Sequence, residues 1–146
     1  SACLVGSEMF IRARVLMARI AGDILPWLKA AATGHLGDMP PIEWSPEPAI
    51  AVVMAAAGYP GDYQKGSVIE GVDAANAMDG VQVFEAGTAR DGEGRRIAAG
   101  GRVLNVTATG ENLHYAADRA YSAIDVIDWP QGFCRRDIAW RALKTH

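Results

Sequence analysis

The stretch GGRVLNVTATGENLHYAADRAYSAIDVI, residues 100–127, decides the fold, because its hydrophobic period changes halfway along. Its first part is rich in valine and threonine and predicts one or two strands, in continuity with residues 95–99. Its second part places apolar residues three or four apart, which is typical of an amphipathic helix, and Thr109 is positioned to cap that helix. The residues of this apolar stripe are Leu113, Ala117, Ala120, Ile124 and Ile127.

Further strands are expected on the N-terminal side of this stretch. Residues 49–57, AIAVVMAAA, read as a buried strand that is apolar on both faces. Residues 81–89, VQVFEAGTA, alternate in the manner of a strand, and a short one is expected at 67–71. The Asp-Gly pair at residues 91–92 predicts a turn that joins residues 81–89 to the following strand as a hairpin.

Two more helices flank these strands. Residues 23–36 begin with Asp23 as a helix cap and end at Gly34, and residues 138–143 form a short helix for which Asp137 is a candidate cap. The sequence therefore predicts an α+β domain, with a small antiparallel sheet flanked by helices.

Composition narrows the functional classes. The chain has 146 residues, enough for one domain with its own core, and its formal net charge of −3 gives no reason to expect nucleic acid or an anionic membrane as a partner. No apolar run approaches the ~20 residues of a membrane span. Cys3 and Cys134 form no disulfide framework and no metal-binding spacing, so a reducing cytoplasm is the expected location.

Several ordered motifs resemble the C-terminal domain of the phosphoribosylamine–glycine ligase family, the glycinamide ribonucleotide synthetases of the ATP-grasp class. The segments that carry the resemblance are AVVMAAAGYPGDYQKGSVIEG (51–71), VFEAGT (83–88), GGRVLNVTATGENLHYAADRAYSAI (100–124) and FCRRDIAWRAL (133–143). The resemblance implies a role in purine biosynthesis, in the ATP-dependent joining of glycine to 5-phosphoribosylamine. It also implies ATP and Mg²⁺ as cofactors of the whole enzyme, bound by an ATP-grasp core that has no counterpart here.

The resemblance suggests three parts of the chain. Residues 1–14 match nothing in the family and are interpreted as a foreign or junction segment, expected to be disordered or packed differently from the ligases. Residues 15–48 are interpreted as a helical lead-in and proline-rich linker, and residues 49–146 as the ligase-type domain.

Candidate substrate-binding residues fall in two places. Arg135 and Arg136 form either an anion clamp or structural ion pairs, and guanidinium groups suit a phosphate of a phosphoribosyl substrate. The loop with Gly58, Tyr59 and Lys65 forms either an anion cradle, through exposed N–H groups, or only a tight connection.

Two functional hypotheses follow. The chain is the C-terminal part of the ligase, inactive by itself and able to bind substrate only when complemented by the missing domains. Alternatively, it is a free-standing binding module that forms homo-oligomers through exposed apolar surface. A weaker alternative is a promiscuous hydrolase that uses Cys134 with His114 or the arginines, if the neighbouring arginines lower the pKa of the thiol.

Overall fold

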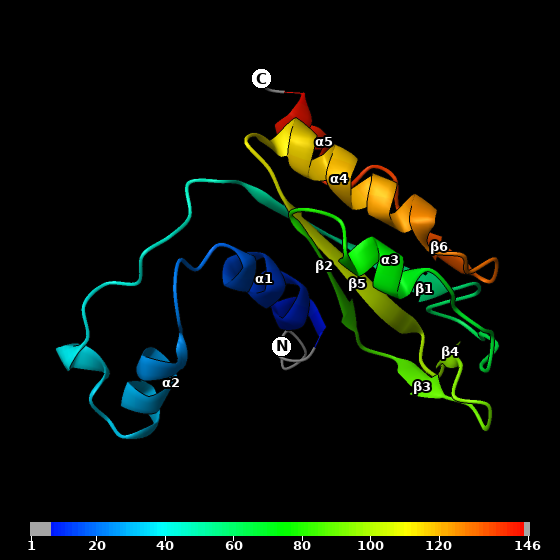
Figure 1. Ribbon diagram of the computed structural model, residues 1–146, viewed down its shortest axis with the longest axis horizontal. Coiled ribbons are helices and arrows are strands. Elements are labelled where there is room, and N and C mark those ends of the chain that lie inside the picture. The colour runs from blue at the N-terminus through cyan, green and yellow to red at the C-terminus, as the bar shows by residue number, and fades with distance from the viewer. Residues whose placement is uncertain (1–6, 145–146) are drawn as a thin grey trace.

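A four-stranded antiparallel sheet forms the centre of the computed structural model, which describes residues 7–144, with side chains from residue 13 onward. The strand order is β2-β5-β1-β6, and β3 and β4 form a separate two-stranded ribbon (Figure 1). The expected α+β fold is confirmed. The strands are β1 Ala49–Ala56, β2 Val81–Glu85, β3 Thr88–Arg90, β4 Arg96–Ala98, β5 Arg102–Thr109 and β6 Gly132–Cys134. The helices are α1 Ser7–Ala18, α2 Leu25–Ala32, η1 Leu36–Asp38 (3₁₀), α3 Val72–Asn76, α4 Leu113–Val126 and α5 Trp140–Leu143.

The main core lies between the sheet and α4. Val52 pairs with Val106 and Met54 with Leu104, so the even-numbered residues of β1 and β5 share one face up to the register shift after Met54. α4 lies on that face, beside α3. Its buried positions are mostly alanines, and such small side chains allow the helix to approach the strands closely. These alanines are Ala116, Ala117, Ala120 and Ala123.

The opposite face of the sheet is more polar and is covered by α1 (Figure 1). Asn105 and Thr107 are buried there, and the Thr107 hydroxyl donates to the Asn105 side-chain oxygen over 2.8 Å. The Arg14 guanidinium lies 5.0 Å from the centre of the Phe84 ring. No regular element was expected for residues 1–14, but Ser7–Ala18 form a helix. Residues 1–6 lie outside the described part.

Several expected boundaries need correction. Thr109 is the last residue of β5 and not a helix cap, because Asn112 takes that place and accepts the Tyr115 N–H over 3.1 Å. Residues 67–71 form only single bridges, from Val68 to Ile97 and from Glu70 to Asp128. The predicted strand 81–89 is divided into β2 and β3, and α3 was not anticipated.

Asp137 does not cap the last helix either. α5 begins after Ala139, whose φ of 64° lies in the left-handed region, and no side chain caps it. The Asp137 carboxylate instead accepts two hydrogen bonds from Arg135, at 2.9 and 2.7 Å. The Asp137 oxygens are occupied by these hydrogen bonds from Arg135 and do not accept from the backbone N–H groups at the start of α5.

Asn112 and Asp137 give a matched test of these helix starts. Asn112→Ala is expected to lower the free energy of unfolding by about 1 kcal/mol, because one N–H of α4 loses its acceptor. Asp137→Ala removes only an exposed ion pair and is expected to have an effect close to the measurement error. Urea unfolding of the two variants beside the parent chain measures the difference, and equal losses would contradict these assignments.

Candidate functional site

The C-terminal end of β1, the start of β5 and the start of β6 meet at one end of the sheet, because these strands are antiparallel. Three segments close this end: residues 57–66, residues 100–102 and Gln131. We call them together the loop edge. Ala56 N–H donates to the Gly101 carbonyl and Ala57 N–H to the Gln131 carbonyl, both over 2.8 Å. These bonds make the loop edge a continuation of the sheet.

The absence of a side chain at Gly101 determines the geometry of the loop edge. A Cβ atom at this position would overlap the Tyr59 ring and lie 3.0 Å from the Tyr63 ring. The two tyrosines pack edge to face, with ring centres 6.2 Å apart. Only glycine therefore allows both rings to close over the strand here.

Arg102 follows Gly101 and lies over the ring of Tyr59. Its guanidinium carbon is 6.0 Å from the centre of the Tyr59 ring, within reach of a cation–π contact. Within residues 7–144, Arg102 forms no ion pair or hydrogen bond through its side chain. A half-buried guanidinium without a carboxylate is available to an anion. Arg102 was not among the binding residues predicted from the sequence, because its position there is typical of the first residue of a strand.

The predicted residues Gly58, Tyr59 and Lys65 all lie in the loop edge. Gly58 has φ +96°, and a Cβ there would overlap the Asp62 carbonyl, so the tight connection needs glycine. Lys65 is exposed, and its neighbour Gly66 donates to the Ala98 carbonyl over 2.7 Å.

A cavity of about 390 Å³ opens beside this loop. Its lining residues include one carboxylate, one phenol and two amides, which can donate to and accept from a polar ligand. The lining consists of Ala57, Asp62, Tyr63, Gln64 and Gln131.

Arg135 and Arg136, the other predicted binding residues, do not join this loop. β6 runs antiparallel to β1, from Gly132 opposite Ala56 to Cys134 opposite Met54, so the arginines lie about 10 Å or more further along. Both are exposed, and their charges are engaged: Arg135 pairs with Asp137, and Arg136 pairs with Asp125 of α4. The structure therefore does not bring the two groups of candidate binding residues together.

Cys134 has the surroundings of an inert thiol. Burial is the largest influence on it and raises the pKa of the thiol, while the nearby Arg136 charge acts in the opposite direction but less strongly. The lowering required for the hydrolase hypothesis is therefore not found. Cys134 lines a cavity with Ile124 and Asp125, whereas His114 lies ten residues earlier on α4, about 15 Å away by helical rise. The two residues cannot form a nucleophile and base pair.

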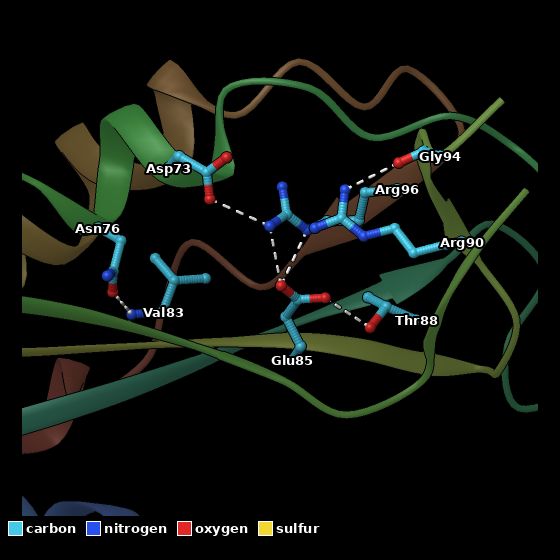
Figure 2. Close-up of polar contacts among 8 residues, drawn as sticks. All are labelled: Asp73, Asn76, Val83, Glu85, Thr88, Arg90, Gly94 and Arg96. Atoms are coloured by element: carbon cyan, nitrogen blue, oxygen red, sulfur yellow. Dashed lines mark hydrogen bonds and ion pairs between the residues drawn. The ribbon is translucent and has the colours of Figure 1, made fainter.

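A second cluster of charges surrounds Arg96, which is only 8% exposed (Figure 2). Its Nε donates to Glu85 over 2.9 Å and its Nη2 to Asp73 over 3.0 Å, which connects β4 to the end of β2 and to α3. Thr88 of β3 donates to the other Glu85 oxygen over 2.7 Å. The hydrogen bond from Arg96 holds the pKa of Glu85 below its usual value.

Charge balance identifies the Arg96 cluster as a structural lock. Arg90 lies directly opposite Arg96 in the β3–β4 ribbon, and Figure 2 shows its side chain reaching the Gly94 carbonyl. Two arginines and two carboxylates leave no net charge to attract an anion. The Arg96 carbonyl accepts the Ile69 N–H over 2.9 Å, so the cluster also holds the segment that follows Gly66. Its partners are 11 and 23 residues away in sequence, which no local pattern reveals.

Arg96 and its neighbour Arg95 allow the lock to be tested. Arg96→Gln is expected to lower the free energy of unfolding by about 2 kcal/mol, because buried charge-assisted hydrogen bonds are lost. Arg95 is 53% exposed and pairs only with residues of the same turn, so Arg95→Gln is expected to have little effect. Thermal and urea unfolding of both variants measure this, and equal stability of the two would contradict the assignment.

Within residues 7–144, no three His, Cys, Asp or Glu side chains gather closely enough to hold a metal ion. No helix in this part of the chain has the length and apolar character needed to cross a membrane.

The chain is similar in sequence to curated proteins. The chain is 55% identical over 130 residues to the phosphoribosylamine–glycine ligase of Phenylobacterium zucineum. The matched residues cover 89% of this chain and 30% of the relative. It is 50% identical over 132 residues to the chloroplastic phosphoribosylamine–glycine ligase of Arabidopsis thaliana, covering 90% of this chain and 25% of the relative. The chain thus spans less than a third of the length of these curated relatives.

A solved structure and a family profile agree with these matches. The crystal structure of the Thermotoga maritima phosphoribosylamine–glycine ligase superposes with a TM-score of 0.61 at 32% identity, covering 76% of this chain and 27% of that one. Residues 49–141, which carry the sheet and the loop edge, match the family profile described as phosphoribosylglycinamide synthetase, C domain. The chain belongs to this phosphoribosylglycinamide synthetase C-domain family.

Proposed function

We propose that this chain supplies a phosphoribosylamine–glycine ligase with part of its binding surface for the phosphoribosyl substrate, at the loop edge. One observation carries the proposal: Arg102 is held against Tyr59, and no carboxylate in the described residues neutralises it. Lys65, which is exposed, adds a second cation to the same loop edge. Guanidinium and ammonium groups together suit a phosphate monoester.

The cavity beside the loop suits the rest of such a substrate. The relatives are named for phosphoribosylamine, a compound with a phosphate, ribosyl hydroxyls and an amine. Asp62 offers acceptor oxygens to an amine or hydroxyl, and Gln64 and Gln131 offer amides that donate and accept. We therefore assign phosphate recognition to Arg102 and Lys65, and recognition of the sugar to the cavity.

The bond-forming chemistry belongs, in this proposal, to the part of the ligase that the chain does not span. ATP-dependent ligation needs phosphoryl groups to be positioned and their charge neutralised, normally with Mg²⁺. The described residues gather no such metal-binding group. The chain by itself is expected to bind a phosphate ester weakly and to ligate nothing. Purine biosynthesis in the cytoplasm is the setting that we propose, and the free thiol of Cys134 is compatible with it.

Phosphate titration monitored by NMR tests the loop edge. Ribose 5-phosphate is expected to bind with a dissociation constant no better than about 1 mM and to shift resonances of Tyr59, Lys65 and Arg102, because few contacts oppose the entropy of association. Arg102→Gln is expected to weaken binding about two- to fivefold, as for an exposed ion pair. Inorganic phosphate and ribose, titrated separately, distinguish recognition of the phosphate from recognition of the sugar.

The matched control for this titration is Arg135→Gln. Arg135 is already paired with Asp137, so its loss is expected to leave the affinity for ribose 5-phosphate unchanged. Shifts that cluster at Arg135 and Arg136 and disappear in Arg135→Gln would restore the clamp predicted from the sequence. They would overturn the assignment to Arg102.

A further inference from the structure

The polar face of the sheet, which α1 covers, holds a buried hydrogen-bond donor without an acceptor (Figure 1). Asn105 of β5 is only 2% exposed, and its Nδ2 atom has no hydrogen-bond partner among the described residues. Its Oδ1 atom already accepts the Thr107 hydroxyl over 2.8 Å. Folded proteins rarely leave a buried donor unsatisfied, so this amide indicates a place for an acceptor.

Arg14 of α1 brings a second donor to the same place. Its guanidinium carbon lies 5.0 Å from the centre of the Phe84 ring, and Phe84 is the cross-strand partner of Asn105. Directly paired residues point to one face of a sheet, so the guanidinium and the amide are both neighbours of this ring. Within residues 7–144, the side chain of Arg14 forms no ion pair or hydrogen bond. Burial lowers its pKa, as expected for a cation without a carboxylate beside it.

A cavity of about 310 Å³ opens one row further along this face. The row that follows Phe84 and Asn105 consists of Gln82 and Thr107, because alternate residues of a strand share a face. Ala18, one helical turn after the arginine of α1, also lines the cavity. None of the described lining residues is acidic. The polar ones are Asn76, Gln82, Thr107 and Thr109.

These groups suit a small carboxylate that also carries a hydroxyl group. A guanidinium and an amide N–H both donate to carboxylate oxygens. One guanidinium neutralises one negative charge, and desolvation beside an aromatic ring opposes a doubly charged phosphate more strongly than a singly charged carboxylate. Threonine hydroxyls and side-chain amides can donate to and accept from the hydroxyl group of the ligand.

We propose that the polar face, between α1 and strands β2 and β5, binds a small hydroxycarboxylate. Its carboxylate group contacts Arg14 and Asn105. Its hydroxyl group lies in the cavity beside Gln82 and Thr107. The site lies further along β5 than the loop edge and does not rest on the proposed function. Arg14 precedes residues 49–141, which match the family profile, so the complete site is a feature of this chain and not of that profile.

NMR titration of the full chain with lactate, at constant ionic strength, tests the site. Lactate is expected to bind with a dissociation constant no better than about 1 mM, because the ligand is small and makes few contacts. It is expected to shift the side-chain amide of Asn105 together with backbone resonances of Phe84 and Thr107. Propionate, which lacks the hydroxyl group, is expected to shift the same resonances with about threefold weaker binding.

Two substitutions and a control assign the contacts. Arg14→Gln is expected to weaken lactate binding about fivefold or more, because the charge-assisted hydrogen bonds are lost. Asn105→Asp keeps an acceptor for the Thr107 hydroxyl but adds a negative charge, so it is expected to abolish binding. Arg95→Gln is the matched control: it makes the same charge change in the β3–β4 turn, where Arg95 pairs only with residues of that turn. Its affinity for lactate is expected to equal that of the parent chain.

Other results would overturn the proposal. Asn105 amide resonances that do not move in excess lactate would mean that water alone satisfies the buried amide. Equal binding of lactate and propionate, or tighter binding of inorganic phosphate to the same resonances, would exclude a hydroxycarboxylate. Equal weakening by Arg14→Gln and Arg95→Gln would indicate a general effect of charge, and this comparison decides even where Asn105→Asp does not fold. Failure of ribose 5-phosphate to bind the loop edge counts only against the proposed function.

Discussion

The close approach of the Tyr59 ring to the backbone of Gly101 is the constraint on which the candidate site depends. The contact exists only because residue 101 has no side chain. It fastens the loop after β1 onto the start of β5, and the next residue, Arg102, then lies over the same ring. The packing of Tyr59 on Gly101 thus places the loop after β1 beside the Arg102 guanidinium. Preorganisation of this kind lowers the entropy that a ligand must overcome when it binds.

The arginines differ in whether a carboxylate already pairs with their side chain. Arg96, Arg135 and Arg136 are all engaged with carboxylates, and their charges hold the β3–β4 ribbon, the last turn and α4 in place. Arg102 has no such partner in the described part of the chain. The adjacent arginines at residues 135 and 136 are more conspicuous in the sequence than Arg102. The sequence predicted Arg135 and Arg136 as binding residues, and their pairing with Asp137 and Asp125 makes them weaker candidates than Arg102.

The long periodic elements could be predicted from the sequence, and the connections could not. β1, β5 and α4 follow from apolar periodicity, which tertiary packing reinforces. Thr109 and Asp137 were wrong as predicted helix caps. Both residue types are common caps, but in the folded chain Asn112 caps α4 and Asp137 binds Arg135. Of the loop edge, Gly58, Tyr59 and Lys65 were binding candidates from the sequence, and that role stays a prediction. Arg102 and the Arg96 lock depend on residues distant in sequence, which no local pattern reports.

The Gly101→Ala variant tests whether the contact between Gly101 and Tyr59 organises the candidate site. An added methyl group must displace the Tyr59 ring, so the account predicts that resonances of the loop edge move and that the shifts induced by ribose 5-phosphate disappear, while the sheet stays folded. Gly92→Ala is the matched control, because a Cβ there meets no atom within 4 Å, and it is expected to behave as the parent chain. If Gly101→Ala binds ribose 5-phosphate with unchanged shifts and affinity, the contact between Gly101 and Tyr59 does not organise the site.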